Sequence, residues 1–208
     1  MTNCHGVSTA DGSWCPSAPR EGRCADRLIV FFWHVGASLW LFRWIFRDPK
    51  VDVRFLILGA IVPDLIDLPI GTLLFVDRYA TGELWAHSLV AASLYMSAVL
   101  ILTRRGRRRR AWMAVGVGWL FHLLLDGMWF SEGVFLWPFF GWELPEGVGP
   151  YWAMAWERAL SDPWRWVLEA LGLAYLIWLW FAVGLNRSSR RTRVIETGRL
   201  PEYVADDR

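Results

Sequence analysis

The sequence predicts an all-α integral membrane protein, a bundle of about five transmembrane helices with an interfacial segment rich in tryptophan. The 208-residue chain is 55% apolar and has a mean hydropathy of +0.27, which is too apolar for an ordinary soluble domain. It contains 16 tryptophans, and indole is the side chain that settles best at a membrane–water boundary. Its arginines fall in short runs that are typical of the flanks of membrane spans.

Residues 1–26 form a polar tail rich in Gly, Ser and Pro, which we expect to be poorly ordered. The tail holds all three cysteines, Cys4, Cys15 and Cys24. Because an odd number cannot form a closed set of disulfides, we interpret them as incidental thiols, with an oxidised pair plus a spare thiol as the alternative. The tail does not have the pattern of a cleaved secretory signal, since it lacks an apolar central region.

Residues 27–186 form the predicted membrane domain. Five apolar stretches within it are long enough, or nearly so, to cross a hydrocarbon core of ~30 Å as helices. Helices are the only spanning structure that this pattern allows, because the chain lacks the alternating strands of a barrel. The five stretches are residues 28–46, 53–76, 84–103, 111–130 and 166–185.

The distribution of lysine and arginine predicts the orientation of these spans. Fifteen basic residues fall on one side of the membrane, including six arginines in residues 104–110 and the basic tail of residues 187–208, whereas six fall on the other. Since the cytoplasmic side carries the excess, we expect a multi-pass protein of the inner (cytoplasmic) membrane with its N-terminus outside and its C-terminus in the cytoplasm. The run at 104–110 is then a topology signal attracted to anionic membrane lipids, and no nucleic acid partner is predicted.

The longest segment between predicted spans, residues 131–165, lies on the extracytoplasmic side. It combines five tryptophans with four prolines, a mixture expected to lie along the membrane surface. A short interfacial helix is predicted at residues 151–160. The sequence makes no prediction of an oligomeric state.

Six ionisable residues interrupt the apolar stretches, although each aspartate costs about 2.5–3.5 kcal/mol at the centre of a span. Asp64 and Asp67 are three residues apart, and His122 and Asp126 are four apart, so each pair is expected to project from one face of its helix. From the predicted helix ends, all six lie in the outer half of the membrane or close to its midplane. They can therefore form a single site that opens outward. The six residues are His34, Asp64, Asp67, His87, His122 and Asp126.

Imidazole nitrogens and carboxylate oxygens together are typical ligands of a catalytic Zn²⁺ site, or of Mn²⁺ or Fe²⁺ where oxygen predominates. A divalent cation also explains how carboxylates stay ionised in a low dielectric. We therefore predict a metal site, with zinc as the preferred ion. The first choice of ligands is His34, Asp64, His87 and His122. Asp67 and Asp126 are predicted to be further ligands, residues that orient an imidazole, or the general base.

Three elements of the sequence resemble the family of membrane-bound metal-dependent hydrolases that includes the LexA-regulated inner-membrane protein YdjM. They are the proline–aspartate element of residues 59–67, the His-Ser-Leu element that begins at His87, and the His-x3-Asp element of His122 and Asp126. The resemblance covers residues 30–142, and His34 matches an early histidine of the family. It implies a membrane-embedded hydrolase that uses these residues as ligands.

If the protein is an enzyme, Zn²⁺ with an open coordination position lowers the pKa of its bound water to about 7 and provides a nucleophile. A pocket near the outer leaflet suits an amphiphile, so an ester or phosphodiester of a lipid or lipid-linked molecule is the expected substrate. One or two ions could bind. The principal alternative is an intramembrane metal-binding protein or an ion or proton transporter that uses the same side chains as a relay. A second alternative is haem ligation by the histidines, but this would leave the aspartates without a role.

Overall fold

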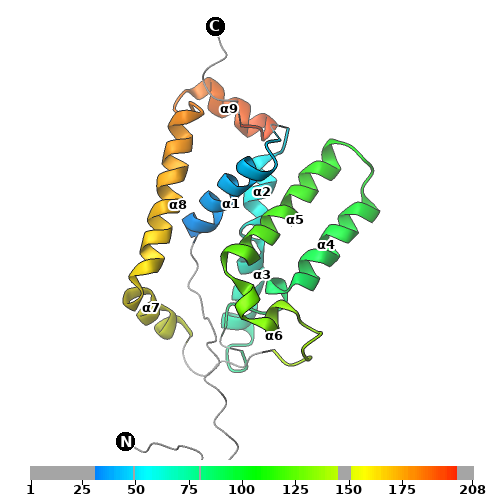
Figure 1. Cartoon of the computed structure of the whole chain (residues 1–208), viewed down its shortest axis with the longest axis vertical. Coiled ribbons are helices and arrows are strands. Elements are labelled where there is room, and N and C mark those ends of the chain that lie inside the picture. The colour runs from blue at the N-terminus through cyan, green and yellow to red at the C-terminus, as the bar shows by residue number, and fades with distance from the viewer. Residues whose placement is uncertain (1–30, 49, 80, 145–150, 201–208) are drawn as a thin grey trace, which may run out of the picture.

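The computed structural model describes residues 31–48, 50–79, 81–144 and 151–200. Over these residues the fold is helical without strands, which confirms the all-α prediction (Figure 1). The predicted N-terminal tail and its three cysteines lie outside them. The elements are α1 (Phe31–Ile45), α2 (Val53–Gly59), α3 (Val62–Pro69), the π-helix η1 (Ile70–Leu74), the 3₁₀ turn η2 (Trp85–His87), α4 (Leu89–Leu102), α5 (Arg107–Leu125), the 3₁₀ turn η3 (Met128–Phe130), α6 (Glu132–Phe135), α7 (Tyr151–Ser161), α8 (Pro163–Ala182) and α9 (Ser188–Thr197).

Two helical segments of the described chain are long and apolar enough to cross a membrane. They are Val53–Leu74, which runs through α2, α3 and η1 over 22 residues, and Pro163–Ala182, which is the 20-residue α8. The apolar α4 has only 14 residues, and α5 begins with four consecutive arginines. Five spans are therefore not confirmed, because length and composition support two of them.

The first of these segments is not one continuous α-helix. Pro63 lacks a backbone N–H and interrupts the helical hydrogen bonds, so α2 ends at Gly59 and α3 begins at Val62. The carbonyl of Ala60, at this break, accepts a hydrogen bond from a histidine of α5 instead of continuing the helix. The break thus creates a backbone acceptor within the bundle.

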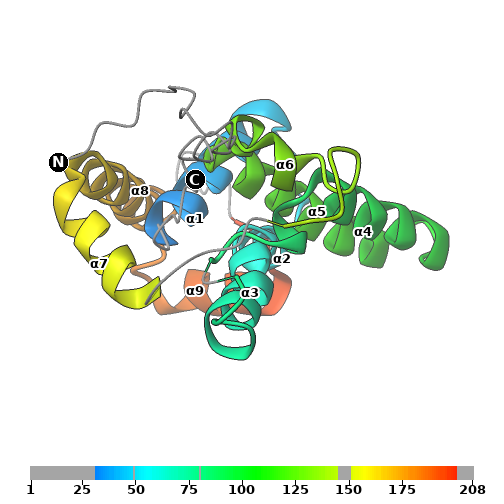
Figure 2. The same ribbon diagram turned by 90° about the horizontal axis from the view of Figure 1, so that it is seen from below.

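The helices cross closely at glycines. α1 packs between α8 and α5, and α5 also packs against α2 and α4, an arrangement that Figures 1 and 2 show from two directions. A Cβ atom on Gly36 of α1 would lie 2.6 Å from the carbonyl oxygen of Gly172 in α8. One on Gly59 of α2 would lie 2.0 Å from the carbonyl oxygen of Val115 in α5. Only glycine permits such backbone contact, which is a common way for helices to associate in membranes.

The predicted helix of residues 84–103 begins later than expected. Residues 85–87 form the turn η2, and α4 starts at Leu89 with Ser88 as its N-cap. The Ser88 hydroxyl accepts a hydrogen bond from the N–H of Ala91 and donates one to the carbonyl of Trp85. His87 therefore lies in a turn before the helix, and Ser88 has the role of a helix cap. A helix is present at the predicted residues 151–160 as α7, and its position at the membrane surface stays a prediction.

The C-terminal helix α9 lies across one end of the bundle, at the top of Figure 1. The Arg54 guanidinium donates a 2.6 Å hydrogen bond to the carbonyl of Ile195, and the N–H of Val53 donates one of 2.8 Å to the carbonyl of Gly198. Asp52 caps α2 and accepts two hydrogen bonds from the Arg54 side chain. These bonds to Arg54 hold the pKa of the Asp52 carboxyl below its usual value.

Because the folded state lowers the pKa of Asp52, its carboxylate stabilises the fold above the unfolded pKa of about 3.9, and this contribution is lost as the pH falls through the folded pKa. We expect Asp52→Asn to lower the melting temperature at neutral pH and to lower it less below about pH 4. Thermal unfolding in detergent across this pH range measures the difference. Asp48→Asn, which changes an exposed acid nearby, is the control, and a pH-independent difference for Asp52→Asn would contradict this role.

Candidate metal centre

The structure brings the six sequence-predicted residues together from four parts of the chain. His34 comes from α1, Asp64 and Asp67 from α3, His87 from the turn η2, and His122 from the last turn of α5, with Asp126 as its C-cap. Five of the side chains are at most 9% exposed, whereas that of Asp64 is 22% exposed. The cluster is thus buried and most open beside Asp64. The role of these residues as metal ligands stays a prediction.

Two imidazoles and two carboxylates form the centre of the cluster. The Nε2 atoms of His87 and His122 are 3.3 Å apart. Oδ1 of Asp64 lies 3.4 Å from Nε2 of His87 and 3.6 Å from Nε2 of His122. Oδ2 of Asp126 completes the group at 3.0 Å from Nε2 of His122 and 3.8 Å from Nε2 of His87.

The Nδ1 atom of each of these two imidazoles donates a hydrogen bond that fixes the ring. Nδ1 of His122 donates a 2.8 Å hydrogen bond to the carbonyl of Ala60, and Nδ1 of His87 donates one of 2.8 Å to Oδ2 of Asp67. A neutral imidazole whose Nδ1 is the donor has its lone pair on Nε2. The two Nε2 lone pairs therefore face each other and two carboxylates, an arrangement of acceptors that requires a cation or protons between them.

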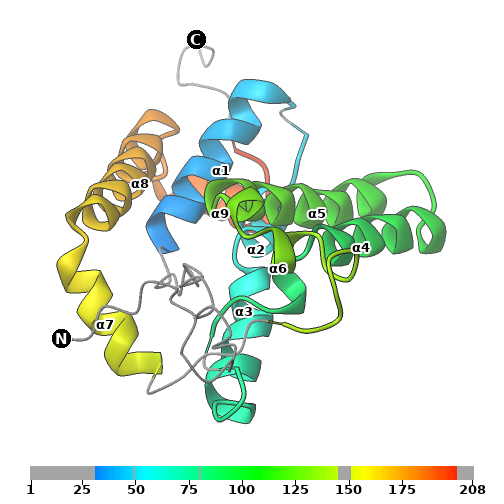
Figure 3. The same cartoon turned by 60° about the horizontal axis from the view of Figure 1, so that its bottom comes forward.

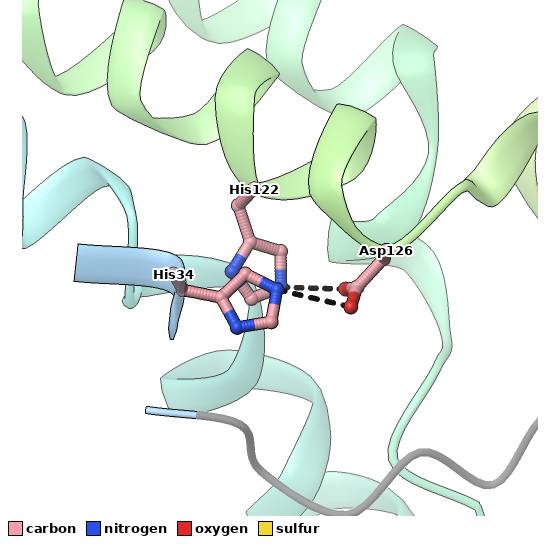
Figure 4. Close-up of side chains that lie close together, drawn as sticks. All are labelled: His34, His122 and Asp126. Atoms are coloured by element: carbon pink, nitrogen blue, oxygen red, sulfur yellow. Dashed lines mark hydrogen bonds and ion pairs between the residues drawn. The ribbon is translucent and has the colours of Figure 1, made fainter. Parts of the chain in front are cut away.

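His34 and Asp126 form the side of the cluster shown in Figure 4. Nε2 of His34 lies 3.0 Å from Oδ1 of Asp126, so the two oxygens of this carboxylate contact different imidazoles. The rings of His34 and His122 are stacked with 4.3 Å between their centroids. If the Asp126 carboxylate is ionised, His34 is the hydrogen-bond donor, and this bond fixes the direction of the other oxygen.

Asp67 organises the turn that carries His87. Its carboxylate accepts hydrogen bonds from the backbone N–H groups of Leu84, Ala86 and His87, in addition to the one from the His87 ring. The indole of Trp119 donates a 2.7 Å hydrogen bond to the carbonyl of Ala86 on the same turn. Together these contacts fix the turn and the orientation of the His87 ring.

The geometry fits a small divalent cation. Zn²⁺ with nitrogen and oxygen ligands at about 2.0–2.1 Å in a tetrahedron keeps its ligand atoms about 3.3–3.4 Å apart. The five separations measured around His87 and His122, between 3.0 and 3.8 Å, are centred on this value. Two groups of three residues have ligand atoms close enough to hold an ion, His34 with His122 and Asp126, and Asp64 with His87 and His122.

Sequence reasoning missed the backbone and indole contacts of the site. The Ala60 carbonyl has no sequence signal of its own, although Pro63 indicates the break that exposes it. Glu83 is only 7% exposed, a burial that its place in the sequence does not indicate. The acids Glu132 and Glu143 are exposed.

The sequence was compared with models of protein families. The family model described as YdjM inner membrane protein matches residues 31–191, which include all six residues of the cluster. No curated protein and no solved structure matches the chain. Since the match covers more than half of the chain, the protein belongs to the YdjM inner membrane protein family.

Proposed function

We propose that the protein is a membrane-embedded metal-dependent hydrolase that acts on an ester or phosphodiester of a lipid or lipid-linked substrate. The proposal rests on one observation. The Nε2 atoms of His87 and His122 lie 3.3 Å apart in a buried site, and their lone pairs face each other and two carboxylates. Zinc is the preferred ion, because the donor set combines imidazole with carboxylate at tetrahedral separations.

In this proposal His87, His122 and Asp126 would hold the ion, and the remaining position, beside the more exposed Asp64, would be left for water and substrate. When bound, a divalent cation polarises the bond under attack and makes a water molecule nucleophilic at neutral pH. The Asp64 side is the most exposed part of the cluster and is where the substrate approaches. Family membership supports the membrane location, and the excess of arginine at the α9 end of the bundle supports a cytoplasmic C-terminus with the N-terminus outside.

The two predicted catalytic aspartates have different roles. Asp67 accepts four hydrogen bonds and positions His87, so it does not take part in proton transfer. Asp126 would be a ligand through Oδ2, and Asp64, beside the open position, is the carboxylate placed to accept a proton from the attacking water. The Nε2–H of His34 donates to Oδ1 of Asp126 and holds this carboxylate in place. His34 is accordingly a positioning residue.

Elemental analysis of the detergent-purified protein tests the metal site directly. We expect about one divalent ion per chain in the wild type and a nearly complete loss in His87→Ala/His122→Ala. His5→Ala, which changes the one histidine of the sequence that is not among the six predicted site residues, is the matched control and should keep the ion. Circular dichroism checks that the double variant remains helical.

Lipid hydrolysis is the second stage of this test. Wild type and double variant are compared with phospholipids in mixed micelles, and turnover that depends on the ion supports the proposal. Metal binding without turnover of any ester or phosphodiester would leave a metal-binding protein and contradict the hydrolase. Equal metal content in wild type and double variant would remove the site itself.

A further inference from the structure

Exposed arginines from two distant segments gather at the α9 end of the bundle. We call them the basic face: Arg104, Arg105, Arg107, Arg108 and Arg110 of the α4–α5 connection and the start of α5, with Arg191 and Arg193 of α9 and Arg187, its N-cap. In Figure 3, where the opposite end of the bundle comes forward, α9 lies behind α1 and α5. The two segments are joined by a hydrogen bond, 3.3 Å long, from Arg107 to the carbonyl of Thr197 at the end of α9.

The basic face is held in shape by arginines that are themselves partly buried or bonded. Arg109 donates hydrogen bonds to the carbonyls of Leu100 and Thr103 and thereby closes the end of α4. Arg54 donates to the carbonyl of Ile195 and thereby fixes α9 on the start of α2. The exposed arginines thus project from a structured surface.

The positive charge of this surface is concentrated. α5 carries four arginines in its first turn, where a helix dipole already disfavours cations, and neither α5 nor α9 has an acidic residue in its first turn. On α9 itself the exposed acid is Glu196. Opposite charge from outside the chain would therefore stabilise both segments.

The position of the basic face identifies the source of that charge. One candidate span starts at Val53, whose N–H bonds to Gly198, and the other ends at Ala182, a few residues before α9. The arginines therefore stand at the level where a layer of lipid headgroups begins. Anionic headgroups offer phosphodiester oxygens, which guanidinium groups bind in bidentate fashion.

We propose that the basic face binds the phosphodiester headgroups of anionic phospholipids in the adjoining leaflet and that these headgroups hold α9 against the bundle. The proposal does not depend on the metal centre. It assigns a lipid role to α9 that is separate from any lipid hydrolysed at the cluster, because α9 lies at one end of the bundle, whereas α3 and the C-terminal end of α5, which carry cluster residues, lie toward the other end (Figure 1).

The test uses the full chain in nanodiscs of phosphatidylcholine, with and without phosphatidylglycerol, and measures hydrogen exchange of the α9 amides. We expect phosphatidylglycerol to slow this exchange by about tenfold or more at low salt, because several arginines act together near an anionic surface. High salt should reduce the effect. The triple variant Arg187→Gln, Arg191→Gln, Arg193→Gln should lose it. Arg78→Gln is the control for the single variant Arg191→Gln, because Arg78 follows the far end of the candidate span that starts at Val53.

Four results would overturn the proposal. They are equal exchange in the two lipid mixtures, protection of the triple variant equal to that of the wild type, the same protection by inorganic phosphate in pure phosphatidylcholine, and protection by single-stranded RNA that exceeds the protection by lipid. The third result would assign the face to small anions, and the fourth to nucleic acid.

Discussion

Replacement of Asp126 by asparagine is expected to remove the divalent ion from the protein. Each oxygen of the Asp126 carboxylate contacts a different imidazole, and the amide would carry no negative charge toward either. We expect metal affinity to fall by more than about 100-fold, a larger loss than removal of an outer partner produces, and hydrolysis to be lost with it. Metal competition with a coloured chelator measures the affinity, and Glu132→Gln, an exposed acid on α6, is the control.

The companion variant His34→Ala separates positioning from coordination. If His34 only orients Asp126, His34→Ala should weaken metal binding by about 10–100-fold while the saturated protein still holds the ion. A loss as complete as that of Asp126→Asn would make His34 a ligand. Unchanged affinity in Asp126→Asn would contradict the proposed ligand set.

Replacement of Gly59 by valine is expected to cause the largest loss of stability among the substitutions considered. The first side-chain carbon would lie 2.0 Å from the backbone carbonyl oxygen of Val115, and both atoms are fixed by helix backbones that cannot move aside without separating α2 from α5. Overpacking usually costs about 1–3 kcal/mol, and a clash with backbone should reach or exceed the upper value. Thermal unfolding in detergent measures this loss.

Gly133→Ala provides the control for Gly59→Val. A Cβ atom at Gly133, in α6, meets nothing within 4 Å. This variant should unfold at the wild-type temperature or slightly above, because alanine favours the helix. A Gly59→Val protein as stable as Gly133→Ala would show that α2 and α5 do not depend on their close crossing.

The helical class and the position of most helices could be predicted from the sequence, because apolar stretches between arginine runs leave few alternatives. The number of spans could not be established in this way. Pro63 divides one stretch into two helices, and the arginines of residues 107–110 belong to the helix that they were expected to flank. Hydropathy does not report either effect, since both depend on where backbone hydrogen bonds begin and end.

The six residues of the candidate site could be named from the sequence because each is costly in an apolar segment. Their division of labour could not be derived. Asp64 and Asp67 have the same chemistry and lie three residues apart, yet Asp64 points to two imidazoles and Asp67 to the backbone of residues 84–87. Similarly, His122 is oriented by the backbone carbonyl of Ala60, and since every residue has such a carbonyl, the residue type at position 60 does not indicate this role.

The stretch from Ala60 to Asp67 acts on both central histidines at once. The Ala60 carbonyl accepts a hydrogen bond from His122, and the Asp67 carboxylate accepts one from His87. Asp64 lies between these two residues in the sequence and beside both rings. A single inserted or deleted residue would turn one contact away from the others by about 100° of helix rotation. The exposed Leu65 and Ile66 can therefore be replaced by other apolar residues during evolution. The length of this stretch cannot change, because it has to match the spacing of two imidazoles on other parts of the chain.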